Sequence, residues 1–234
     1  MCSLEYIEKM SLEPLVRWVG AQRDVLRGDI DGRIALGDLR AIPHLYALGP
    51  LARIRGEVTV FDGTPSIARV VDGRVIVDGS ADVHACFLVY ASVPAWTAAV
   101  VSTPLNDAHD LEPLVRAAAT TQGLEGDIPV PFRVRGTARA TTCHVLDKRD
   151  TSPHTPERHE AAKFRFTIRA APIEAIGFHS EGHRGVFTPG DSNLHVHLRT
   201  TDGRWSGHME ELALAAPWIL GVPLRMPAGG IRDA

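Results

Sequence analysis

Cysteine is scarce in this sequence, and long runs of apolar residues are missing. The three cysteines, Cys2, Cys86 and Cys143, lie far apart and form no CxxC pair, so we expect no disulfide framework. Even the apolar stretch over 91–101 contains a proline and falls short of the roughly 18 to 20 residues of a membrane-spanning helix. Reduced thiols and the lack of a span predict a cytoplasmic protein that does not enter a membrane.

A surplus of basic charge is also missing. The 25 Lys and Arg residues face 28 Asp and Glu residues, a formal net charge of -3, which leaves no basic field to hold nucleic acid. Residues 1–13 carry early acidic side chains and no apolar stretch before a cleavage site, so we expect no secretory signal. With 234 residues, 44% of them hydrophobic, the chain has enough material for a packed core.

The spacing of apolar residues predicts more strands than helices. Helical spacing predicts a helix over 110–120, with Asp110 as its N-cap. Alternating β-branched residues bounded by Asp-Gly turns predict a β-meander over 56–77. Further helices are expected over 12–27 and 35–39, a solvated loop over 150–160, and strands over 86–91, 98–102, 130–134, 138–146, 163–170, 175–178, 193–198 and 205–214.

Three of the eleven histidines have a spacing suited to a metal ion. Side chains alternate across a strand, so His195 and His197 project from the same face. A turn at Asp202-Gly203 lets His208 on the next strand come beside them. Three imidazoles with open positions are typical of a catalytic zinc site. The alternative is that the His-x-His spacing is a coincidence on a sheet surface and that His208 is an ordinary histidine.

Other histidines and one cysteine have simpler interpretations. We expect solvent exposure for His44, His84, His109, His154 and His159, and nothing in the sequence fixes His179 or His183 at a metal. Cys143 is expected in the core. Its neighbour His144 points to the opposite face of a strand, so the two cannot easily act together.

Several segments occur in an order that is typical of one known family. They are Gly28–Gly32, Ala35–Leu39, Gly56–Gly63, Pro189-Gly190, His195-x-His197 and Gly207-His208, within a span from Arg27 to Glu211. Together they resemble the alpha-acetolactate decarboxylase family. The resemblance implies an α+β fold, with a mixed β-sheet lobe joined to a β-barrel-like lobe. It also implies a single domain over 1–234 with lobes at 1–125 and 126–234, and commonly a homodimer.

The resemblance also implies roles for particular residues. One zinc ion per chain would be held by His195, His197 and His208, and Glu57 would be the family's active-site glutamate. The alternative for Glu57 is an exposed strand residue. In the family an arginine-rich strand of the form RTRT supplies an arginine to the substrate site.

This sequence departs from the family at two functional positions. Thr142 and His144 stand where the arginine-rich strand has arginines. Family members also contribute a glutamate from a longer C-terminal segment, but no Glu follows Glu211 here. Arg133, Arg135 and Arg139 are the candidate substitutes, and of these Arg133 best matches a family strand arginine. The alternative is a solvated strand arginine.

These features predict a zinc-dependent lyase that acts on a 2-hydroxy-3-oxo acid or a related oxo compound through a metal-stabilised enediolate. Glu57 would move a proton, and Arg133 would bind the substrate. The departures favour a changed substrate or reaction. The alternative is a non-catalytic, metal-stabilised scaffold or small-molecule-binding protein. Metal-assisted hydrolysis is a third possibility that nothing in the sequence promotes.

Overall fold

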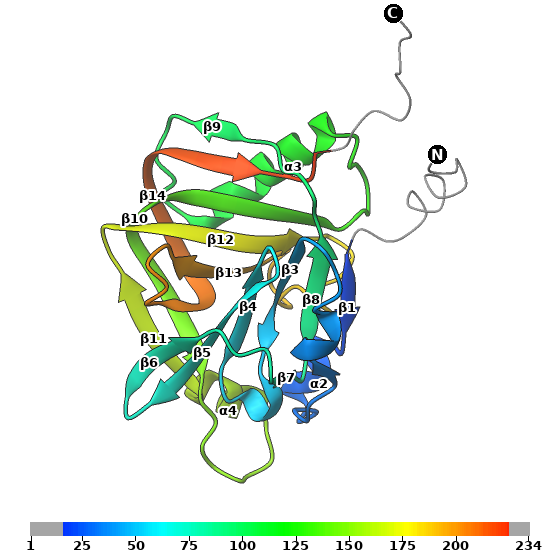
Figure 1. Ribbon diagram of the computed structural model, residues 1–234, viewed down its shortest axis with the longest axis vertical. Helices are drawn as coiled ribbons and strands as arrows, with labels where there is room; N and C mark the ends of the chain where they lie inside the picture. The colour runs from blue at the N-terminus through cyan, green and yellow to red at the C-terminus, as the bar shows by residue number, and fades with distance from the viewer. Residues whose placement is uncertain (1–15, 225–234) are drawn as a thin grey trace, which may run out of the picture.

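Two six-stranded β-sheets make up most of the computed structural model, which describes residues 16–224 (Figure 1). The first sheet has the order β1-β8-β3-β4-β5-β6. Its strands are β1 (Arg17–Val19), β3 (Leu45–Pro50), β4 (Glu57–Phe61), β5 (Thr64–Val71), β6 (Arg74–Asp78) and β8 (Leu88–Ser92). All pairings between these strands are antiparallel. The expectation of a mixed sheet in this lobe is therefore wrong. A separate two-stranded sheet pairs β2 (Ile34–Ala35) with β7 (His84–Ala85).

The second sheet has the order β11-β10-β12-β13-β14-β9. Its strands are β9 (Ala99–Val101), β10 (Val130–Leu146), β11 (Lys163–Ile168), β12 (Ala171–His179), β13 (Leu194–Thr200) and β14 (Ser206–Gly221). Because β10 also pairs with β14, the sheet closes on itself into a barrel-like lobe. The predicted α+β class, with a sheet lobe joined to a barrel-like lobe, is confirmed. The lobe boundary at residue 125 stays a prediction.

Helices are short and few in the described part of the chain. They are α2 (Gln22–Leu26), α3 (Leu111–Thr121) and α4 (Pro156–Ala161), with 3-10 turns η1 (Leu36–Leu39), η2 (Ala52–Ile54) and η3 (Ala108–Asp110). None of the helices described between residues 16 and 224 is long and apolar enough to cross a membrane.

Three local predictions need correction. The helix expected over 12–27 is wrong at β1, because pairing with β8 extends residues 17–19; its part before residue 16 lies outside the described residues. The loop expected over 150–160 contains α4, whose first turn is capped by the Thr155 side chain. Asp110 makes no cap hydrogen bond, whereas Asp107 accepts one from the backbone N–H of His109 at 2.8 Å.

The second sheet separates two apolar layers. On one face α3 packs against a layer that includes Leu194 and Val196 of β13. On the other face Phe178 of β12 packs with Phe87, which directly precedes β8 of the first sheet. Side chains alternate along β13, and His195 is the register partner of Phe178, so His195 faces the first sheet. The fold therefore places the histidine face of β13 between the two sheets.

Candidate metal centre

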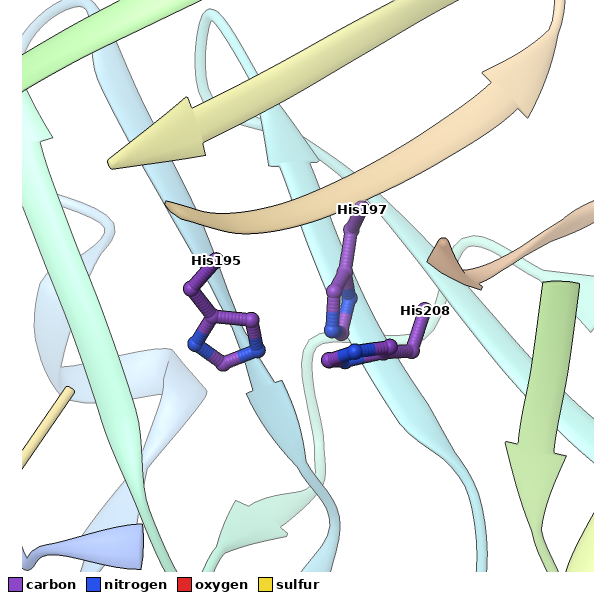
Figure 2. Close-up of side chains that lie close together, drawn as sticks. All are labelled: His195, His197 and His208. Carbon is purple, nitrogen blue, oxygen red and sulfur yellow. The ribbon is translucent and has the colours of Figure 1, made fainter. Parts of the chain in front are cut away.

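Three histidine rings meet between the sheets. His195 and His197 lie on β13, and His208 lies on β14 as the direct register partner of His197. The ring centroids are 5.3 Å apart for His195 and His197, 4.9 Å for His195 and His208, and 5.2 Å for His197 and His208. Figure 2 shows the three rings turned toward one another. One nitrogen from each ring can be chosen so that all three lie within 4.8 Å of one another.

Hydrogen bonds to the outer nitrogens orient two of these rings. Nδ1 of His197 donates to the backbone oxygen of Val58 at 2.9 Å, and Nδ1 of His195 donates to the backbone oxygen of Phe187 at 2.8 Å. The side-chain amide of Gln22 lies 3.0 Å from the same His195 nitrogen. These bonds place the proton on Nδ1 and leave Nε2 with its lone pair. Nε2 of His197 is buried without a hydrogen-bond partner. A bonded outer nitrogen and a free inner nitrogen are what a metal-ligating histidine needs, so these residues fit a metal ion.

Burial keeps the three histidines neutral. It lowers the pKa of His195 to about 4 and the pKa values of His197 and His208 well below the ordinary 6.5. A neutral imidazole has the lone pair that a metal ion requires. The cluster can therefore accept an ion at neutral pH without first releasing protons.

Glu57 is the buried acid beside the cluster. All five residues of β4 are buried, and Glu57 at its start is 1% exposed. Its Oε2 lies 3.7 Å from Nε2 of His197, and its Oε1 has no hydrogen-bond partner among the described residues. Burial raises the pKa of Glu57 to about 8. The alternative interpretation of Glu57 as an exposed strand residue is therefore wrong.

Two adjoining cavities border two of the three histidines, His195 and His208. A cavity of about 290 Å³ is lined by Glu57, His195 and His208, together with His144 and Lys163. A second cavity of about 650 Å³ shares His144, Lys163 and His208 with the first. His208 therefore borders both cavities, and a small molecule in either one can contact this residue.

His144 and Lys163 were not predicted as site residues. The pairing of β10 with β14 puts His144 directly opposite His208, with ring centroids 4.5 Å apart. Nδ1 of His144 donates to the Glu210 carboxylate at 2.9 Å, and this bond holds the pKa of Glu210 at about 2. Cys143 is fully buried in the core, as expected. Strand alternation already predicted that His144 points away from Cys143 and the core. The sequence did not show that His144 lies opposite His208, because β14 lies far along the chain from β10.

Arg133 lies away from this cluster. It lines a separate cavity of about 290 Å³ with residues such as Tyr46 and Glu174. Its guanidinium carbon lies 5.4 Å from the centroid of the Trp96 ring. The structure does not bring Arg133 to the histidines, and its role in substrate binding stays a prediction that its position does not support.

The histidines expected at the surface divide into two groups. His44, His84 and His109 are exposed, as predicted. His154 is buried, so its expected exposure is wrong, and His159 is partly buried. Nε2 of His154 lies 3.2 Å from Nδ1 of His159, because α4 turns this segment back on itself and brings the rings together.

The fold and the site define a class: an α+β protein whose two sheets enclose three neutral imidazoles and a buried carboxyl, a donor set suited to one divalent metal ion. The sequence matches no protein-family model and no curated protein.

Solved structures give the comparison in detail. Acetolactate decarboxylase from Bacillus subtilis subspecies spizizenii superimposes with a TM-score of 0.74 at 14% identity, over 90% of this chain and 86% of that chain. Alpha-acetolactate decarboxylase from Bacillus subtilis strain 168 gives 0.73 at 15% identity, over the same shares. A Staphylococcus aureus protein described as similar to alpha-acetolactate decarboxylase gives 0.71 at 13% identity, over 88% and 84%. The chain thus has the fold of acetolactate decarboxylase, as the resemblance implied.

Proposed function

We propose that this protein is a zinc-dependent lyase that acts on a 2-hydroxy-3-oxo acid or a related oxo compound. The observation that carries the proposal is the convergence of His195, His197 and His208 beside the buried Glu57 at a cavity. The fold shared with acetolactate decarboxylases supports it. Three nitrogen ligands would leave positions open for substrate oxygens.

The reaction needs a Lewis acid and a proton. A bound zinc ion would supply the Lewis acid for adjacent carbonyl and hydroxyl oxygens of the substrate. When carbon dioxide leaves, the electron pair of the broken bond stays on the substrate carbon and must be matched by a proton. Glu57 is the buried acid among the described residues that line the cavity, which supports it as the proposed source of that proton. Phe87, whose ring is stacked 5.9 Å from that of His195, helps to exclude water.

The charges around the cavities favour a substrate other than acetolactate. Among the described lining residues, Lys163 is the one Lys or Arg of either cavity. Its Nζ lies 2.8 Å from Glu160 and 3.5 Å from Glu210, so its charge is already compensated. A substrate carboxylate would lack the bidentate partner that an arginine gives, and burying it unpaired is costly. These charges support an altered substrate or a related reaction.

Metal content and carbon dioxide release test the proposal together. We expect untagged protein with His197→Ala to lose one zinc ion per chain relative to wild type by elemental analysis, whereas His109→Ala, at an exposed histidine, keeps it. Wild type is then assayed on acetolactate and a panel of 2-hydroxy-3-oxo acids and related oxo compounds, beside a chelated sample. Folded wild type without zinc would overturn the proposal.

A non-catalytic, metal-stabilised binding or scaffold protein is the second candidate. The compensated charge of Lys163 favours it, because a scaffold needs no cation for a substrate carboxylate. This candidate predicts that chelation lowers the melting temperature while no oxo compound is turned over with zinc present. Turnover above the chelated control would exclude it.

A further inference from the structure

A second group of metal-ligand side chains lies on the opposite face of the barrel-like sheet. Glu112 is in the first turn of α3, His179 is the last residue of β12, and Glu181 follows it by two positions. One donor atom from each lies within 4.8 Å of the others. His179 is the register partner of Leu194, whose side chain alternates with that of His195, so this group faces α3 and not the three-histidine cluster.

His179 gives the independent sign of a missing ligand. The residue is 6% exposed, and its Nε2 is buried without a hydrogen-bond partner in the described structure. That atom lies 3.5 Å from Oε1 of Glu112, a carboxylate of the same group. A buried imidazole nitrogen without a partner is unfavourable, and a bound cation would satisfy it.

The neighbouring contacts allow an ion to enter. Asn193 donates to Oε1 of Glu112 at 2.8 Å and so orients this carboxylate, as groups behind metal ligands do. Nη1 of Arg116 lies 2.9 Å from Oε1 of Glu181. Both side chains are about half exposed, and a surface ion pair of this kind is weak. An ion can therefore displace Arg116 at little cost.

We propose that Glu112, His179 and Glu181 form a second binding site for a divalent transition-metal ion such as zinc. One imidazole and two carboxylates are a nitrogen and oxygen donor set that such ions accept. The ion would tie α3 to the end of β12. Because Glu112 also lines the larger cavity, it would fix one wall of that cavity.

Zinc titration of the full chain tests this site, with stoichiometry as the readout. We expect wild type to bind about two zinc ions per chain by calorimetry and elemental analysis. Glu181→Gln, at a side chain that is about half exposed, should lose one ion or bind it at least about tenfold more weakly. Glu112→Gln and His179→Asn should behave alike, while Glu125→Gln, an exposed acid outside both clusters, should match wild type.

A double variant separates the two sites. The zinc ion that remains in His197→Ala should be lost when the same chain also carries Glu181→Gln, which assigns that ion to the second site. If Glu181→Gln and Glu112→Gln both bind zinc as wild type does, the second site is overturned. If His197→Ala loses no ion while Glu181→Gln does, the proposed lyase site fails and the second site stands.

Discussion

Glu57 stands at the start of β4 with its carboxyl almost completely buried and Oε1 without a partner in the described structure. A buried acid costs free energy in either protonation state, because water solvates it well and this pocket offers few hydrogen bonds. The other four residues of β4 are also buried, three of them apolar, so packing alone gives no reason for a carboxyl. Such a position is typical of a residue that serves chemistry.

Glu57→Gln retains the size of the side chain but removes its acid. We expect kcat/KM on any substrate found in the panel to fall by about 10²- to 10⁴-fold, the usual contribution of a general acid or base, with zinc content unchanged. Steady-state kinetics and elemental analysis check this. Glu125→Gln, which lines neither cavity, should keep the wild-type rate. Full activity of Glu57→Gln would remove Glu57 from the mechanism.

His154 and His159 link the protein's stability to pH. Their hydrogen bond needs one ring nitrogen to donate and the other to accept. Burial lowers the pKa of His159 to about 3, against an ordinary 6.5, and also lowers that of His154. As pH falls, the two histidines therefore become protonated in the unfolded chain before they do so in the folded protein. Their contribution to stability is complete above pH 6.5 and is lost as the pH falls toward their pKa values in the folded protein.

The substitution His159→Gln should make the free energy of unfolding less dependent on pH. In wild type, His159 alone should lower the free energy of unfolding by about 2 kcal/mol between neutral pH and about pH 5. Urea unfolding at several pH values in this range measures this free energy. His109→Gln, at an exposed histidine, should keep the wild-type slope. The same slope in His159→Gln and wild type would contradict the assignment.

Strand β14 depends on Gly207 for its place between β13 and β10. Gly207 is the register partner of Leu198 and directly precedes His208. A Cβ at Gly207 would lie 2.6 Å from the backbone oxygen of His144 and 3.3 Å from the ring of Phe166. Since the closer atom belongs to the backbone of a paired strand, β14 itself would have to move.

Gly207→Ala should therefore damage both the fold and the metal site. We expect a loss of about 1–3 kcal/mol in the free energy of unfolding, with weaker zinc binding because His208 moves with the strand. Chemical denaturation and zinc titration measure the two effects. Gly79→Ala is the matched control, because its Cβ would meet nothing nearer than 3.9 Å. Unchanged stability of Gly207→Ala would mean that β14 shifts freely.

Across the whole molecule, the three-histidine site joins the two sheets. His197 on β13 donates to the backbone of Val58 on β4, and Ser206 on β14 donates to Thr59 at 3.2 Å. The acid beside the cluster, Glu57, comes from the first sheet, whereas the three imidazoles come from the second. An ion held here would stabilise the packing of one sheet on the other.

Chelation should therefore lower the melting temperature. An ion present at about a thousand times its Kd stabilises the folded state by about 4 kcal/mol. For a chain of this length that corresponds to a Tm shift of roughly 8–16 °C. Differential scanning calorimetry with and without chelator measures the shift, and His197→Ala should show a smaller one. Equal shifts in the two proteins would place the stabilising ion elsewhere.

The expected homodimer stays a prediction, which sedimentation would test.

Local patterns in the sequence determined much of what lies within one element. Alternation along a strand put His195 and His197 on one face, and the Asp202-Gly203 turn brought β14 back beside β13. Helical spacing predicted α3, and the Asp-Gly turns predicted the meander of β4, β5 and β6. These features depend on backbone geometry over a few residues, which the sequence contains.

Only the tertiary structure decided which distant strands lie together. The pairing of β10 with β14 made His144 a neighbour of His208, and the packing of β4 on β13 buried Glu57 beside His197. Pairing with β8 also turned an expected helix at 17–19 into a strand. No local periodicity specifies such contacts, because they depend on the free energy of burying whole faces against each other.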